Sequence, residues 1–275
     1  MRQQQEIRTE MGLHRNRIVV KVGTSTLTYE SGKNNLRSFG RLACVLSDMQ
    51  NMGHDVILVS SGAIAIGANK LQMKARPSGM REKQAAAAVG QCSIMFLYDR
   101  FFADYDKTVA QILLNAEDIE QEEKKENLTN TFDTLLEMGI IPIVNENDSV
   151  SYTEIESAER LFGDNDMLSA VVAVLCRADK LVILSDIDGL YDHDPRLYPK
   201  AQRLSRIERI DESVYAMAGG AGSRRGTGGM RTKLQAAELA TARGIDTIIT
   251  NGSRPEALYD IASGKDAGTL FAARH

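Results

Sequence analysis

The sequence lacks the two glycine-rich fingerprints that most often mark a phosphate-binding loop. A Walker A loop ends in Gly-Lys followed by Ser or Thr, but the two Gly-Lys pairs of this chain, at 32–33 and 264–265, precede Asn and Asp. A dinucleotide-binding turn has the spacing G-x-G-x-x-G, which the glycines between Gly220 and Gly226 miss by one residue. These absences argue against a P-loop nucleotide-binding protein and against a dinucleotide-dependent oxidoreductase.

Histidine and cysteine are also scarce. The four histidines have no metal-ligand spacing, so a histidine-centred site is disfavoured. The three cysteines, Cys44, Cys92 and Cys176, lie far apart in apolar stretches with a helical pattern. An odd number of cysteines without pairing spacing is typical of reduced thiols in the cytoplasm. We therefore expect all three to be buried and structural.

Long apolar runs and strong positive charge are missing as well. No apolar run approaches the ~20 residues that a membrane-spanning helix needs, and the polar residues 1–16 do not resemble a secretory signal. The net charge of −4 disfavours a nucleic-acid or anionic-membrane partner. The 275 residues, 43% hydrophobic and 25% charged, fit a cytoplasmic globular protein with a substantial core.

Apolar strands alternate with amphipathic helices from residue 17 onward. Continuous apolar strands separated by helices predict an α/β fold with a mostly parallel sheet covered on both faces. The charged stretch 117–127 is expected to be a solvated loop or the start of a helix. The predicted strands are 17–23, the first part of 55–67, 108–114, 140–148, 180–186 and 245–252, and the predicted helices are 35–53, 82–102, 127–139, 166–178 and 232–244.

Polar residues follow several of these strands, where ligands bind in an open parallel sheet. The clusters are Lys21 with Gly23, Thr24 and Ser25; Ser60 to Ala63; Asn145 to Asp148; Ser185, Asp186, Asp188 and Gly189; and the stretch 162–170. A glycine-rich turn at 226–229 also leads into a helix that carries Lys233. Taken together, Lys21, Lys233, backbone N–H donors and carboxylates supply what phosphoryl transfer requires.

Six motifs occur in order along the chain: VVKVGTSTL, VSSGAIAIG, IPIVNENDSV, GDNDMLSA, LSDIDGLYDHDPR and GTGGMRTKLQAA. Together they resemble the glutamate 5-kinases, a family of the amino acid kinase superfamily, over about residues 16–272. The resemblance implies a three-layer αβα sandwich with a mainly parallel central sheet. It also implies transfer of the ATP γ-phosphoryl group to the side-chain carboxylate of L-glutamate, giving L-glutamyl 5-phosphate, the first step of proline biosynthesis.

The resemblance also implies roles for individual residues. Lys21 and Lys233 are expected to hold the transferring phosphoryl group, and Asp166 is expected to orient both lysines. The expected glutamate-binding residues are Ser61, Gly62, Ala63, Asp148 and Asn165. The expected nucleotide-binding residues are Lys21, Gly23, Ser185, Asp186, Thr227, Gly228, Gly229, Met230, Arg231, Thr232 and Lys233.

The same resemblance implies an organisation and a set of partners. Residues 1–16 are an N-terminal extension, and residues 17–275 form the kinase domain, with a glutamate-binding part at about 17–175 and a nucleotide-binding part at about 176–275. ATP is expected with Mg²⁺ on its phosphates and no metal site in the protein. Proline as feedback inhibitor, a homo-oligomer, and handover to glutamyl phosphate reductase are further expectations.

Two departures and three alternatives complete the prediction. The chain ends without room for the RNA-binding-like PUA domain of many relatives, so we expect a short form. The link before GDND is longer than usual, which leaves the geometry over the glutamate site open. The alternatives are a sister kinase acting on another carboxylate or phosphate acceptor, a non-catalytic nucleotide-binding regulator, and the disfavoured dinucleotide oxidoreductase.

Overall fold

A computed structural model describes residues 16–150, 165–218 and 229–274. The predicted N-terminal extension therefore lies almost wholly outside the described residues, as do Thr227 and Gly228 of the glycine-rich turn. Within the described ranges, no helix is long and apolar enough to cross a membrane.

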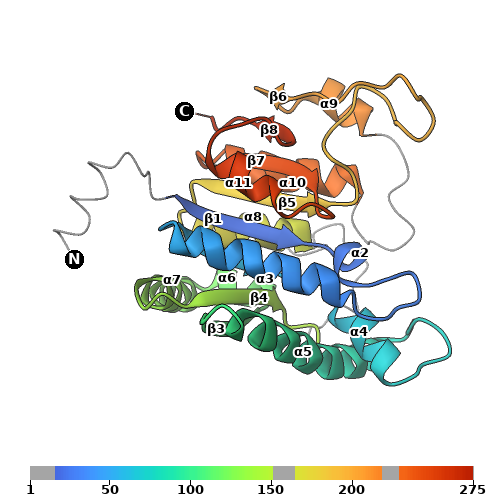
Figure 1. The fold of residues 1–275 in the computed structure, drawn as a ribbon, viewed down its shortest axis with the longest axis vertical. Coiled ribbons are helices and arrows are strands. Elements are labelled where there is room, and N and C mark those ends of the chain that lie inside the picture. The colour runs from blue at the N-terminus through green and yellow to red at the C-terminus, as the bar shows by residue number, and fades with distance from the viewer. Residues whose placement is uncertain (1–15, 151–164, 219–228, 275) are drawn as a thin grey trace.

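The described strands form one sheet in the order β3-β4-β2-β1-β5-β7-β8-β6 (Figure 1). They are β1 (Arg17–Val22), β2 (Asp55–Val59), β3 (Val109–Leu114), β4 (Ile141–Glu146), β5 (Lys180–Ser185), β6 (Arg206–Ile207), β7 (Asp246–Asn251) and β8 (Thr269–Phe271). Neighbouring strands are parallel except β7 and β8. The prediction of a mainly parallel sheet is confirmed.

Helices cover both faces of this sheet (Figure 1). They are α2 (Thr24–Leu27), α3 (Leu36–Asn51), α4 (Ala63–Lys70), α5 (Met80–Ala103), α6 (Ala116–Glu120), α7 (Glu122–Glu137), α8 (Asn165–Leu175), α9 (Glu212–Met217), α10 (Met230–Thr241) and α11 (Ala257–Ala262). Strand β1 shows why both faces are needed. Its side chains alternate across the sheet. Val19 therefore belongs to the core on the face covered by α7, α8 and α10, while Ile18 and Val20 belong to the core on the face covered by α3, α4, α5 and α11. The three-layer sandwich is confirmed.

The structure differs from the sequence-based prediction in its short elements and in two cysteines. The stretch 117–127, predicted as a solvated loop or helix start, contains most of α6 and the beginning of α7. The prediction of buried cysteines is right for Cys176 and wrong for Cys44 and Cys92, which are exposed. Both exposed cysteines lie on helices. Adjacent residues of a helix point to different faces, so apolar neighbours in the sequence do not show that a cysteine is buried.

Helices α4 and α5 approach each other unusually closely, and two glycines make this possible. A Cβ added at Gly90 would overlap the carbonyl oxygen of Ala63, and one added at Gly67 would overlap the carbonyl oxygen of Ala86. In each case the obstacle is backbone, which cannot turn aside. The contact matters for the site, because α4 begins at the Ser-Gly-Ala turn.

Gly90→Ala is expected to lower the free energy of unfolding by about 3 kcal/mol, since the added methyl group forces α4 away from α5. Urea denaturation measures this loss. Gly79→Ala is the matched control, because Gly79 precedes α5 with φ −78° and nothing lies within 4 Å of its added Cβ. The same loss in both variants would contradict the close-packing explanation.

Candidate active site

The site lies beyond the carboxyl ends of the central strands. Strand β1 pairs with β2 on one side and with β5 on the other, so Lys21 lies beside Val59 and Ile183 near the end of each strand. Helices α8 and α10 begin at the same edge, and they bring Asp166 and Lys233 to Lys21. Parallel topology thus gathers three residues that are distant in the sequence.

Asp166 binds both lysines at once. Its Oδ1 lies 2.5 Å from the Nζ of Lys21, and its Oδ2 lies 3.0 Å from the Nζ of Lys233. Thr232 Oγ1 donates a hydrogen bond to Oδ2 over 3.1 Å. Asp166 is fully buried, and Lys21 and Lys233 are 5% and 7% exposed. These three side chains together carry a charge of +1, which suits the arrival of an anion.

The lysines keep the Asp166 carboxylate ionised. Burial alone would raise the pKa of this carboxyl group, but the charges of Lys21 and Lys233 outweigh burial and lower the pKa to about 2. A carboxyl group whose pKa falls on folding stabilises the protein above its unfolded pKa. That stabilisation declines as the pH falls below the unfolded pKa of 3.8 and is gone below about 2, so the Asp166 carboxylate is fully ionised at neutral pH.

The Ser-Gly-Ala turn after β2 forms the next part of the site. Ser61 Oγ donates to the carbonyl of Val22 over 2.9 Å, which ties the turn to the end of β1. Gly62 has φ 91°, a left-handed conformation that glycine adopts without strain. This turn places Ala63 at the first position of α4, where the first backbone N–H groups have no acceptor within the helix and can bind an anion.

Asn165 joins this turn to α8. Its Nδ2 donates to the carbonyl of Ser60 over 2.6 Å and to Oδ1 of Asn145 over 3.0 Å. Asp148 lies in the turn that follows β4 and is half-buried. The structure thus brings Asn165 to the Ser-Gly-Ala turn. Asp148 lies on the loop that follows β4.

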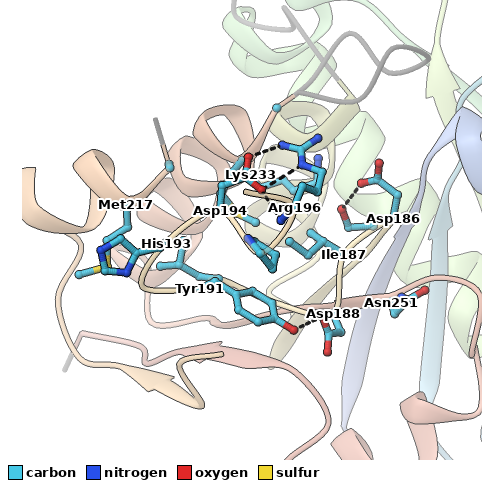
Figure 2. Close-up of a pocket in the computed structure, with 16 residues that line it drawn as sticks. Asp186, Ile187, Asp188, Tyr191, His193, Asp194, Arg196, Met217, Lys233 and Asn251 are labelled. Carbon is cyan, nitrogen blue, oxygen red and sulfur yellow. Dashed lines mark hydrogen bonds and ion pairs between the residues drawn. The ribbon is translucent and has the colours of Figure 1, made fainter. Parts of the chain in front are cut away.

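A cavity of about 290 Å³ opens on the β5 side of Lys233 (Figure 2). Its lining residues are Ser185, Asp186, Ile187, Asp188, Leu190, Tyr191, His193, Asp194, Pro195, Arg196, Met217, Ala218, Gly229, Met230, Lys233 and Asn251. Five of them are predicted nucleotide-binding residues, namely Ser185, Asp186, Gly229, Met230 and Lys233. The cavity has the size and mixed polarity of a small-molecule site.

The other predicted nucleotide-binding residues that the structure describes do not line this cavity. Thr232 turns to Asp166, and the guanidinium of Arg231 lies 5.9 Å from the ring centre of Tyr215. Gly23 adjoins the lysine pair, since a Cβ added there would lie 3.7 Å from Lys21 Nζ. Thr227 and Gly228 belong to the residues that the structure does not describe.

Several lining residues were missed as site residues, and all but three of them come from the loop after β5. Tyr191 donates to Asp188 over 2.8 Å, and Arg196 donates to both carboxylate oxygens of Asp194 over 3.0 and 2.9 Å (Figure 2). The sequence did carry a signal for a binding loop, because LYDHDPR concentrates aromatic and charged residues shortly after a buried strand. Asn251 also lines the cavity from the end of β7, and Met217 and Ala218 line it from the end of α9.

Comparisons with known proteins agree with this geometry. The amino acid kinase family matches residues 16–251. Glutamate 5-kinase of Clostridium perfringens is 56% identical, with 94% of this chain and 96% of the relative covered. Glutamate 5-kinase of Enterococcus faecalis is 49% identical, over 93% of this chain and 94% of the relative.

Solved structures show the same fold at low sequence identity. Carbamate kinase from Giardia lamblia, bound to AMP-PNP, superposes with a TM-score of 0.67 at 17% identity, covering 95% of this chain and all of that chain. UMP kinase from Ureaplasma parvum gives a TM-score of 0.65 at 15% identity, covering 94% of this chain and 99% of that chain. The chain belongs to the amino acid kinase family and, within it, to the glutamate 5-kinases.

Proposed function

We propose that this protein transfers the γ-phosphoryl group of ATP to the side-chain carboxylate of L-glutamate, giving L-glutamyl 5-phosphate and ADP. The observation that carries the proposal is the buried Lys21–Asp166–Lys233 cluster between the Ser-Gly-Ala turn and the cavity. A phosphoryl group travelling from the cavity toward the turn would pass the two lysines. The identity of the close relatives supports glutamate as the acceptor.

The chemistry needs charge stabilisation more than proton transfer. A glutamate side chain has a pKa of about 4.3, so it is already a nucleophile at neutral pH. One of its carboxylate oxygens bonds to the γ-phosphorus while the bond from that phosphorus to the β–γ bridging oxygen breaks and ADP leaves. The obstacle is the approach of an anion to a polyanion, which fixed positive charge overcomes.

Lys21 and Lys233 supply that charge in this proposal. The lysines act as point charges on the transferring group, and Asp166 holds their Nζ atoms within 2.5 and 3.0 Å of its own oxygens. Because the cluster is buried and already assembled, little reorganisation is needed when the charge moves. Asp166 is therefore a positioning residue, and the lysines are the catalytic residues.

Glutamate is proposed to bind between the Ser-Gly-Ala turn and Asn165. The N-terminus of α4 at Ala63 offers N–H groups to the α-carboxylate, while Asn165 and Asp148 offer oxygen atoms to the α-ammonium group. ATP fills the cavity beside Lys233. Mg²⁺ enters as the MgATP complex, bound to the phosphates.

A substrate panel tests this proposal. Purified protein with MgATP and hydroxylamine should form the hydroxamate of glutamate, and it should turn over aspartate, acetylglutamate, carbamate or UMP far more slowly. Preference for one of these other acceptors would make the chain a sister kinase in activity. Nucleotide binding without turnover of any acceptor would indicate a non-catalytic nucleotide-binding regulator.

Asp148→Ala is expected to raise the KM for glutamate about 10-fold or more, because one partner of the α-ammonium group is lost. The KM for ATP should stay within about twofold, since Asp148 lies away from the cavity lining. Initial rates at saturating ATP and then at saturating glutamate separate the two constants. A changed KM for ATP with an unaltered KM for glutamate would show that Asp148 acts on ATP binding and not on glutamate binding.

The remaining expectations belong to the same proposal. They are feedback inhibition by proline, assembly into a homo-oligomer, handover of the labile acyl phosphate to a reductase, and a cytoplasmic location. We also propose the division into a glutamate-binding part at about 17–175 and a nucleotide-binding part at about 176–275, and the order of the strands in the sheet supports it. Strands β1 to β4 lie on one side and β5 to β8 on the other.

A further inference from the structure

We propose that Gln91 of α5 is a positioning residue that, through Asn145, holds Asn165 with its amide oxygen toward the amino acid substrate. The inference rests on the proposed function and deepens it, because it concerns recognition of the α-ammonium group. Its basis is a row of four side-chain amides that crosses the interior from α8 to β3.

The amides all donate in the same direction. Asn165 Nδ2 donates to Asn145 Oδ1 over 3.0 Å, and Asn145 Nδ2 donates to Gln91 Oε1 over 2.9 Å. Gln91 Nε2 then donates to Gln111 Oε1 over 3.3 Å. Asn145 and Gln91 are 1% and 9% exposed, so water does not replace these partners.

The direction of the row fixes the orientation of Asn165. An amide side chain has two N–H donors at one end and an acceptor oxygen at the other. The donors of Asn165 bond to Asn145 and to the carbonyl of Ser60, so the atom that it can offer a ligand is its carbonyl oxygen. An oxygen accepts hydrogen bonds from an ammonium group, whereas an inverted amide would present N–H groups and repel it.

Gln91 controls this orientation through Asn145. The oxygen of Asn145 accepts from Asn165 and also from the backbone N–H of Glu146 over 3.0 Å. Its nitrogen needs an acceptor on the opposite side, which Gln91 supplies. Without that acceptor a buried donor is left unpaired, which is costly. Asn145 then shifts from its present position to find another acceptor, and Asn165 keeps only the carbonyl of Ser60 as a fixed partner.

The backbone holds Gln91 at a fixed place relative to the substrate turn. The preceding residue, Gly90, packs directly against the carbonyl of Ala63. Helix α5 therefore contacts both sides of the proposed glutamate site, through Gly90 at the Ser-Gly-Ala turn and through Gln91 at the amides.

Gln91→Met keeps the volume of the side chain and removes its hydrogen bonds. We expect the KM for glutamate to rise about tenfold, the loss typical of one buried hydrogen bond, with the KM for ATP within about twofold. The decisive comparison uses glutarate, which has both carboxylates of glutamate but no ammonium group. Its Ki as a competitive inhibitor should stay within about twofold, because glutarate has no ammonium group for Asn165 to contact. A general loosening of the site would instead weaken the binding of glutamate and glutarate equally.

Cys92→Ser is the matched control, since Cys92 is the exposed neighbour of Gln91 on the same helix. Gln111→Leu tests the row of amides from its exposed end. It replaces Gln91→Met in the experiment if that variant does not fold. It should raise the glutamate KM about threefold, again without changing the glutarate Ki. An unchanged glutamate KM in Gln91→Met, or equal losses for glutamate and glutarate, would overturn the inference.

Failure of the proposed function would look different. In that case the wild-type protein forms no glutamyl hydroxamate. Calorimetric titration with glutamate and with glutarate then makes the same comparison through binding constants. A wild type that is active, with Gln91→Met indistinguishable from Cys92→Ser, refutes the role of Gln91 alone.

Discussion

Lys233→Ala is expected to lower kcat about 10³-fold, the effect typical of removing one preorganised charge or donor from a transition state. Lys233 is both a residue of the cavity lining and a partner of Asp166, so it stands where the ATP γ-phosphate would meet the acceptor. Single-turnover measurement with MgATP and glutamate separates the chemical step from product release. Turnover equal to that of the wild type would show that Lys233 is not catalytic.

The same variant should also lose some stability. The structure pairs Lys233 with Asp166 in the free protein, so removing Lys233 takes away one buried ion pair. Lys21 still neutralises Asp166 when Lys233 is removed, so the protein should fold. Gln235→Ala is the control, because Gln235 is exposed on the same helix.

The Asp166→Asn substitution is expected to have the second large effect, and the free energy of unfolding is the quantity that should change most. The variant keeps Lys21 and Lys233 charged and buried but removes the carboxylate between them. Removing one partner of a buried ion pair costs about 3–5 kcal/mol, which urea denaturation measures as a lower free energy of unfolding. We also expect kcat to fall about 10²-fold, because the lysines lose the group that holds them in place.

Inorganic phosphate should partly restore the stability of Asp166→Asn, since an anion bound between the lysines replaces the lost charge. Asp99→Asn, an exposed site on α5, should show neither the loss nor the recovery. An unfolding free energy equal to that of the wild type would mean that the cluster does not depend on Asp166.

The long elements of the fold are predictable because their residues are buried together. Strand β1 is a β-branched run whose core residues are fully buried, and α3 shows an apolar face along its whole length. The short strands β6 and β8 were missed, because two or three residues carry no period. Their stability comes from pairing with each other and with β7, which lies elsewhere in the sequence.

The candidate site divides in the same way. The end of a parallel strand predicts where Lys21 lies, and a helix start predicts the place of Asp166. No spacing predicts that both lysines bind the two oxygens of Asp166. The row from Asn165 to Gln91 was equally out of reach, because it depends on how closely α5 packs against α4.

The central claim is direct transfer of the γ-phosphoryl group to the side-chain carboxylate of glutamate, and oxygen isotopes test it most directly. Glutamate labelled with ¹⁸O in the side-chain carboxylate is incubated with the protein, MgATP and hydroxylamine, and the released phosphate is analysed by mass spectrometry. Hydroxylamine attacks the acyl carbon, so the bridging oxygen leaves with the phosphate. The account predicts one ¹⁸O atom in each phosphate, and none when the label is in the α-carboxylate. Unlabelled phosphate from side-chain-labelled glutamate would contradict it.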